Sequence, residues 1–185
     1  MADFFDALDD KHIAMISKQP VFFVATAAEG ARINLSPKGY DAFRVLGPKR
    51  VAYLDLAGSG NETHAHLSQD GRITLMFCNF DRPALILRIY GTGRAVLPQD
   101  EEWAELSSHF DLMPGTRQIF DIAVESVQTT SGWGVPSMEF KDERATLQKA
   151  HAQSDPEEWL ARMQGRDASI DGIPVRTTDR YISGD

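Results

Sequence analysis

A glycine-rich turn with hydroxyl and amide side chains lies between two stretches of more regular pattern. It follows a predominantly apolar run at residues 50–56 and precedes a helical pattern at 61–69. At such a strand-to-helix junction, several backbone N–H groups point toward one spot beside the positive end of the helix dipole, where a phosphate group can bind. The candidate phosphate ligands in and beside this turn are Ser59, Gly60, Asn61 and Thr63.

The turn also has an ordinary interpretation. Ser59 or Asn61 could cap the helix, and the glycines could serve only to relieve backbone strain. The turn lacks the Gly-Lys-Ser/Thr ending of a P-loop and the glycine spacing of a dinucleotide-binding fingerprint. A second anion-binding segment is therefore needed to favour ligand binding over capping.

Residues 32–39 supply such a segment, because polar and apolar residues alternate along it. Side chains two positions apart share one face of a strand, so Arg32, Asn34 and Ser36 lie together, with Lys38 just beyond. A solvated strand face shows the same alternation. The segment nevertheless offers a hydroxyl, an ammonium group, an amide for a ring edge, and Gly39, where a bulky ligand can approach.

The energetics of binding favour a phosphorylated cofactor with a large flat ring. Charge-assisted hydrogen bonds contribute about 1.5–3 kcal/mol each, and a helix N-terminus contributes up to ~2 kcal/mol. Micromolar affinity needs roughly 8 kcal/mol after the costs of association are met. Phosphate contacts alone fall short of this, so burial of a ring has to supply the rest. A flavin satisfies both requirements better than a simple sugar phosphate.

Two further residues are candidate cofactor contacts with ordinary alternatives. A lone strand arginine such as Arg88 is usually a surface charge. Its strand face also carries Tyr90, Thr92 and Arg94, however, which favours a polar lining. Trp133 lies in a glycine-containing loop and could be a core residue, a cover for the flavin ring or a dimer contact. Aromatic residues in such loops are frequent at interfaces, which favours the dimer contact.

No metal site or nucleophilic catalytic site is predicted. His64 and His66 are two positions apart on the predicted helix, so they point to different sides and cannot both bind one ion. Cys78 lies in an apolar strand pattern, where a thiol usually acts as a small core residue. We assign no catalytic residue from the sequence.

Composition narrows the class of protein. The 185 residues include 27 acidic and 19 basic side chains, and the resulting net charge of −8 argues against a nucleic-acid partner. The single cysteine excludes an intrachain disulfide and favours a reducing compartment. No apolar run approaches the roughly 20 residues of a membrane helix, and the N-terminus lacks a signal-peptide pattern. We expect a single cytoplasmic domain with no membrane partner.

The segments that must position these side chains are mainly strands. Alternating or β-branched patterns predict six strands, at residues 21–27, 32–36, 50–56, 72–79, 85–97 and 118–130. Helices are predicted at 61–69, 100–110, 144–152 and 156–163, with one amphipathic helix or two short ones at 4–16 and an irregular tail at 166–185. Antiparallel strands with marginal helices predict a mainly β (α+β) fold, a six-stranded antiparallel split β-barrel. Residues 20–130 would form the barrel core, and 131–185 a helical and irregular C-terminal extension.

Several of these motifs resemble one known family. Asn-Leu-Ser-Pro-Lys-Gly at 34–39 and Gly-Ser-Gly-Asn-Glu-Thr at 58–63 are the most specific, and strand patterns between about residues 20 and 96 accompany them. The chain resembles the pyridoxamine 5'-phosphate oxidase-related FMN-binding proteins with the split β-barrel fold. Residues 133–140 and 170–174 resemble one bacterial subgroup of that family.

The resemblance implies a homodimer with FMN at the subunit interface. Asn34, Ser36 and Lys38 would meet the flavin, and Ser59, Asn61 and Thr63 would lie near its phosphate. Residues of the other subunit, around Trp133, would close the site.

The family's arginine- and histidine-rich C-terminal substrate motif does not occur in the tail at 176–185. The resemblance therefore does not predict that this protein acts on the family's vitamin substrate. The resemblance predicts an FMN-dependent oxidoreductase acting on an unknown small molecule. The alternatives are a flavin- or haem-binding protein without turnover, a deazaflavin-dependent reductase, and a barrel without a cofactor that acts through interactions.

Overall fold

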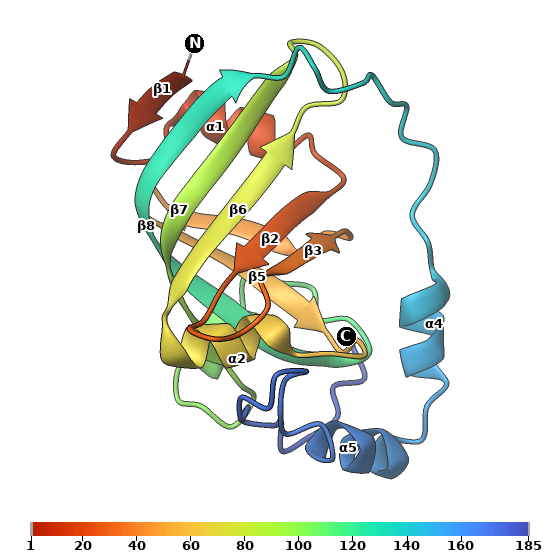
Figure 1. Cartoon of the computed structure of the whole chain (residues 1–185). Coiled ribbons are helices and arrows are strands. Elements are labelled where there is room, and N and C mark those ends of the chain that lie inside the picture. Colours follow the sequence, from red (N-terminus) through yellow and green to blue (C-terminus); the bar gives the residue numbers. More distant parts are fainter. Residues whose placement is uncertain (1, 185) are drawn as a thin grey trace.

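Strands of one antiparallel sheet coil around the main core in the computed structural model, which describes residues 2–184 (Figure 1). The strands are β1 (Ala2–Phe5), β2 (Phe22–Thr26), β3 (Asn34–Lys38), β4 (Phe43–Gly47), β5 (Arg50–Leu56), β6 (Arg72–Cys78), β7 (Leu85–Val96) and β8 (Thr116–Ser131). Their order is β3-β2-β6-β7-β8-β5-β4, with β1 added against β8. Because β3 and β4 end this order without pairing with each other, the sheet is open rather than closed.

The predicted mainly antiparallel fold is confirmed, but the number of six strands is wrong for the described residues, which form eight. The predicted helical region at 4–16 begins instead with β1, which pairs with one end of the long strand β8. The five-residue strand β4 was not predicted and pairs with β5. Strands of four or five residues are too short to show a clear alternation, so only their pairing partners reveal them.

Five helices lie at the margins of the sheet within the described residues. They are α1 (Asp10–Ile16), α2 (Glu62–Gln69), α3 (Trp103–Ser107), α4 (Thr146–Ala152) and α5 (Pro156–Gln164). The start of α1 is fixed by Asp9, whose side chain accepts a hydrogen bond from the backbone of His12. The predicted helices α2, α4 and α5 are confirmed to within two residues. By contrast, α3 is much shorter than predicted, because residues 100–102 and 108–110 form turns.

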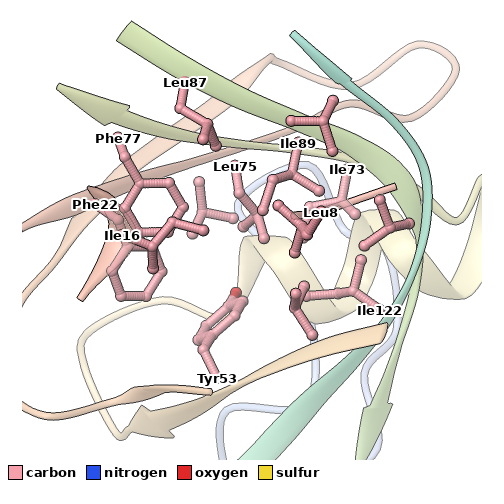
Figure 2. Packing of buried hydrophobic residues seen from close by; sticks show 14 of the residues in the cluster. Leu8, Ile16, Phe22, Tyr53, Ile73, Leu75, Phe77, Leu87, Ile89 and Ile122 are labelled. Atoms are coloured by element: carbon pink, nitrogen blue, oxygen red, sulfur yellow. The ribbon is translucent and has the colours of Figure 1, made fainter. Parts of the chain in front are cut away.

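The main core fills the concave side of the sheet with aliphatic and aromatic side chains (Figure 2). Phe22 and Phe77 stack at a centroid distance of 5.5 Å, and Tyr53 meets Phe22 edge-on at 5.6 Å. Leu75 and Leu87 are completely buried between them and the aliphatic residues of the neighbouring strands. Burial of each such side chain contributes about 1.5–3 kcal/mol, which fixes the strands that carry the site.

The bulge in β7 depends on glycine. The pairing between β7 and β8 shifts register between Tyr90 and Gly91. A Cβ atom on Gly91 would lie 2.2 Å from the carbonyl oxygen of Ala123 on β8, which no side chain can tolerate. The bulge therefore requires glycine at this position.

The chain after β8 leaves the sheet and returns to its far end (Figure 1). Residues 132–145 run outside the sheet to α4 and α5, and the C-terminal segment (residues 145–184) ends near α2 and the end of β5. Trp159 and Met163 of α5 bury their side chains against Ala57, directly after β5. Ile173 packs in a second small cluster with Ala65 of α2. The C-terminal segment is thereby attached beside the glycine-rich turn. The last residue of the predicted tail, Asp185, lies outside the described residues.

The described residues include no helix with the length and apolar character needed to span a bilayer.

Candidate functional site

The two segments singled out from the sequence line one pocket of about 390 Å³. Strand β3 forms one wall, and the turn between β5 and α2 forms another. Asp55 and Leu56 of β5 and Arg117 and Phe120 of β8 complete the lining. The lining residues from the two predicted segments are Asn34, Ser36, Pro37, Lys38, Gly58, Ser59, Gly60, Asn61, Glu62 and Thr63. Side chains about 25 positions apart in the chain are thus brought to the same cavity.

On β3 the polar residues face inward and the apolar residues face outward. Asn34, Ser36 and Lys38 are half-buried, whereas Leu35 and Pro37 between them are exposed. This reverses the usual arrangement of a strand with one buried face, where the polar side chains face solvent. The alternation in the sequence therefore marks the pocket wall rather than a solvated face.

Asn34 connects β3 to both neighbouring elements. Its amide nitrogen donates to the hydroxyl of Thr26 on β2 at 3.2 Å and to the hydroxyl of Thr63 on α2 at 3.1 Å. The amide oxygen accepts a hydrogen bond from Ser36 at 3.0 Å. These contacts fix the amide and hydroxyl groups along this wall of the pocket.

Asn61 occupies the N-cap position of α2 without capping the helix. Its side chain forms no hydrogen bond to the first turn, and its Oδ1 accepts instead from Nε2 of Gln118 at 2.7 Å. A helix without a side-chain cap keeps free N–H groups in its first turn. The alternative in which the side chain of Asn61 caps the helix is therefore not observed, and this end of α2 keeps donors available for an anion.

A buried carboxylate, Asp55, organises the floor of the pocket. Its Oδ1 accepts from Nζ of Lys38 at 2.9 Å, and its Oδ2 accepts from Nε of Arg117 and Nε2 of Gln118 at 2.8 Å each. Burial by itself would raise the pKa of Asp55, but the charges and hydrogen bonds of Arg117 and Lys38 outweigh it and hold the pKa well below its usual range. Asp55 is therefore ionised at neutral pH.

Asp55, Arg117 and Gln118 were not among the residues predicted to form the site. The sequence contains one signal of this group: Asp55 stands between two leucines near the end of β5. A charge buried at such a position needs a partner of opposite charge. The sequence does not identify that partner, because Arg117 lies 62 positions away.

The pocket offers an anion directed hydrogen-bond donors rather than a net positive charge. The charged side chains that line it are Lys38, Arg117, Asp55 and Glu62, and their formal charges cancel. The carboxylate of Glu62 accepts a hydrogen bond from the backbone N–H of Ile170 at 3.0 Å. The groups able to bind a phosphate are therefore the ammonium of Lys38, the nearby hydroxyls and the backbone N–H groups of the turn.

Four of the predicted site residues do not line this pocket in the single chain. Arg32 precedes β3 and pairs with Asp171, and its backbone N–H also donates to Asp171 at 2.9 Å. Gly39 follows β3 and is not part of the lining. Arg88 lies on β7, where it donates to the hydroxyl of Thr130 at 3.3 Å, and Trp133 is 88% exposed after β8.

The two histidines of α2 diverge, as predicted from their spacing. Nδ1 of His64 lies 2.7 Å from Oε1 of Gln118, whereas Nδ1 of His66 lies 3.0 Å from the hydroxyl of Thr26. Burial lowers the pKa of His64. Within residues 2–184, no group of three or more histidine, cysteine or acidic side chains could hold a metal ion.

Comparison with known families now assigns the fold that carries this pocket. The sequence profile described as pyridoxamine 5'-phosphate oxidase matches residues 8–131, which include every strand from β2 to β8. The chain belongs to this family. The resemblance inferred from the motifs at 34–39 and 58–63 is confirmed, and the C-terminal segment lies beyond the matched residues.

One relative in the family is a fungal protein. The pyridoxamine 5'-phosphate oxidase family protein ustO of Aspergillus flavus is 38% identical over 144 residues, which cover 75% of this chain and 58% of that protein. The chain thus matches little more than half of the relative's length.

Solved structures support the fold. HupZ from Group A Streptococcus has a TM-score of 0.53 at 22% identity, covering 66% of this chain and 98% of that one. A structure described as a putative pyridoxamine 5'-phosphate oxidase from Lactobacillus delbrueckii has a TM-score of 0.54 at 14% identity, covering 66% and 94%. At these identities the similarity concerns the fold alone.

Proposed function

We propose that the pocket between β3 and the turn after β5 binds FMN, and that the protein is a flavin-dependent oxidoreductase acting on a small molecule. The observation that carries this proposal is the shared pocket itself, since two separate donor-rich segments line it together. Ser59, Asn61, Thr63 and the N-terminus of α2 would hold the phosphate, with Lys38 as the mobile cation. Asn34 and Ser36 would contact the flavin.

The donor set fits the phosphate of such a cofactor. Lys38 is paired with Asp55, but Asp55 keeps its hydrogen bonds from Arg117 and Gln118 if Lys38 turns to a ligand. Lys38 is therefore able to leave its partner without stranding a buried charge. The uncapped first turn of α2 supplies further donors of the kind that bind phosphate.

The pocket also has apolar surface for a ring. Pro37, Leu56 and Phe120 are part of its lining. A bound flavin would supply hydride or electron transfer, while the protein would hold the ring, orient it and tune it by hydrogen bonding. The amide of Asn34, fixed by two donated hydrogen bonds, is suited to orienting a ring edge.

We further propose that the working form is a homodimer whose second subunit completes the site. Arg88 and Trp133 lie outside the pocket of their own chain, so they would act in the pocket of the other subunit. Exposed apolar side chains support an interface, since Trp133, Ile33 and Leu35 are all largely exposed and Leu35 lies on the edge strand β3. Size-exclusion chromatography with light scattering measures the mass, and a monomer at micromolar concentration would contradict the dimer.

Titration with two flavins tests the proposal directly. FMN and riboflavin share the ring and differ in the phosphate, so tighter binding of FMN measures the contribution of the phosphate site. We expect a clear preference for FMN in the full-length protein, followed by flavin fluorescence or calorimetry. Failure to bind either flavin would contradict the proposal.

Reduction of the bound flavin separates an enzyme from a carrier. We expect the absorption of the FMN-loaded protein to bleach with NADH or NADPH and to return in air. Stable FMN binding without reduction by either donor would favour the carrier over the oxidoreductase. Preferential uptake of a deazaflavin over FMN would identify a deazaflavin-dependent reductase instead.

A further inference from the structure

Three side chains from distant parts of the chain hold the carbonyl groups of the turn after β5. Nη2 of Arg117 donates to the carbonyl oxygen of Gly60 at 2.8 Å, and Nη1 of Arg166 donates to that of Gly58. Nε2 of His151 lies 2.8 Å from the carbonyl oxygen of Ala57. Three of the carbonyls in this turn are thus fixed by side chains from outside the turn.

The tautomer of His151 follows from its second contact. Nδ1 lies 3.0 Å from Nε1 of Trp159, and an indole nitrogen can only donate. Nδ1 must therefore accept, which places the proton of the neutral ring on Nε2, facing Ala57. Burial lowers the pKa of His151, in agreement with a neutral ring.

Two of these contacts hold the turn from outside the pocket, because neither His151 nor Arg166 is part of its lining. In a trans peptide, the carbonyl of one residue and the N–H of the next point in opposite directions. The N–H groups of Gly58 and Ser59 are therefore directed away from His151 and Arg166. Within residues 2–184, these two N–H groups have no backbone acceptor, and both residues line the pocket.

Two of the three clamps come from the C-terminal segment, which lies beyond the family match. His151 belongs to α4, and Arg166 lies just after Gly165, the C-cap of α5. Trp159 is completely buried and links the two helices through His151. Further along the segment, the N–H of Ile170 holds the carboxylate of Glu62, the acidic side chain nearest in sequence to the turn.

We infer that Arg166 is a positioning residue for a phosphate in this pocket, acting through the carbonyl of Gly58 to present the N–H groups of the turn. This inference rests on the proposed function. It assigns to the C-terminal segment a part in ligand selectivity, namely the preference for phosphorylated over phosphate-free ligands. Arg166 itself binds the rear of the turn and does not contact the ligand.

The test compares FMN with riboflavin in full-length variants. Arg166→Gln removes the guanidinium clamp, and we expect FMN to bind about tenfold more weakly while riboflavin affinity changes by less than about twofold. Arg162→Gln is the matched control, because Arg162 is an exposed arginine one turn earlier on α5 and forms no ion pair among the described residues. This control should keep the wild-type ratio of the two affinities.

The outcomes distinguish the inference from the proposed function. If the wild type binds FMN no more tightly than riboflavin, the phosphate site itself is wrong. If the wild type prefers FMN and Arg166→Gln keeps that preference, or loses affinity for both flavins equally, the positioning role of Arg166 is wrong. Should Arg166→Gln fail to fold by circular dichroism, Arg166→Lys keeps the charge without the planar fork and is expected to lose a smaller part of the preference.

Discussion

Lys38 and Asp55 form an ion pair with unequal exposure: Nζ lies 2.9 Å from Oδ1, while the side chain of Lys38 is 24% exposed and that of Asp55 only 2%. Asp55 has two further donors, in Arg117 and Gln118, whereas the ammonium group of Lys38 has no other hydrogen-bonded partner among the described residues. The carboxylate is therefore a fixed structural group, and the ammonium is the part of the pair that a ligand can recruit.

Removing the ammonium group of Lys38 should weaken the binding only of ligands that carry a phosphate. We expect Lys38→Ala to weaken FMN binding by about 1.5–3 kcal/mol, the contribution of a charge-assisted hydrogen bond. Riboflavin should bind the variant and the wild type alike. Titration calorimetry checks both, with Lys49→Ala as an exposed lysine control outside the pocket. Unchanged FMN affinity would remove Lys38 from the site.

Removal of the buried carboxylate should instead destabilise the fold. Asp55→Asn leaves the nearly buried guanidinium of Arg117 without its counter-charge, so we expect a loss of about 3–5 kcal/mol in the free energy of unfolding at pH 7. Urea unfolding measures this. The surface pair of Asp179 with Arg180 is the control, and Asp179→Asn should cost less than about 1 kcal/mol.

The lowered pKa of Asp55 also predicts how the free energy of unfolding depends on pH in the acidic range. The pKa of Asp55 is lowered in the folded protein, so its contribution is complete above the unfolded-state value of about 3.9 and is lost as the pH falls toward the folded-state value. We expect the wild type to lose stability below about pH 4 more steeply than Asp55→Asn. Parallel curves for the two proteins between pH 3 and 5 would contradict the assignment.

His151 predicts a second pH effect nearer neutrality. Burial lowers its pKa, so the unfolded state binds its proton more readily and stability falls as the pH drops below about 6.5. Protonation also removes the acceptor of the Trp159 indole N–H. His151→Gln should show a shallower decline in unfolding free energy between pH 7 and 5. Equal slopes for the wild type and His151→Gln over this range would contradict the contribution of His151.

Two glycines with the same φ angle allow the cost of backbone strain to be measured separately from the cost of a steric clash. Gly115 and Gly172 both have φ +81°, but a Cβ on Gly115 would lie 2.2 Å from the ring of His151, whereas one on Gly172 meets nothing within 4 Å. Gly172→Ala should cost about 1–2 kcal/mol, the ordinary penalty of this conformation. Gly115→Ala should cost several kcal/mol more by urea unfolding. Equal losses would show that the His151 ring gives way.

The helices and strands show how much of the fold the local sequence pattern predicts. Strand β5 was predicted with its observed bounds, and α2, β6 and β7 to within one residue, because alternation, helical periodicity and glycine placement act between near neighbours. Strands β1 and β4 were missed, since segments of four or five residues owe their conformation to β8 and β5 beside them.

The amino-acid sequence by itself determined the two donor-rich segments, because the alternation at 34–38 and the glycines at 58 and 60 are local properties of the chain. The tertiary structure alone decided that they share a pocket, that Asp55 and Arg117 form its floor, and that Arg166 holds a carbonyl 108 positions away. Hydrogen bonds and ion pairs form between groups that folding brings within about 3 Å, and sequence separation does not encode that proximity.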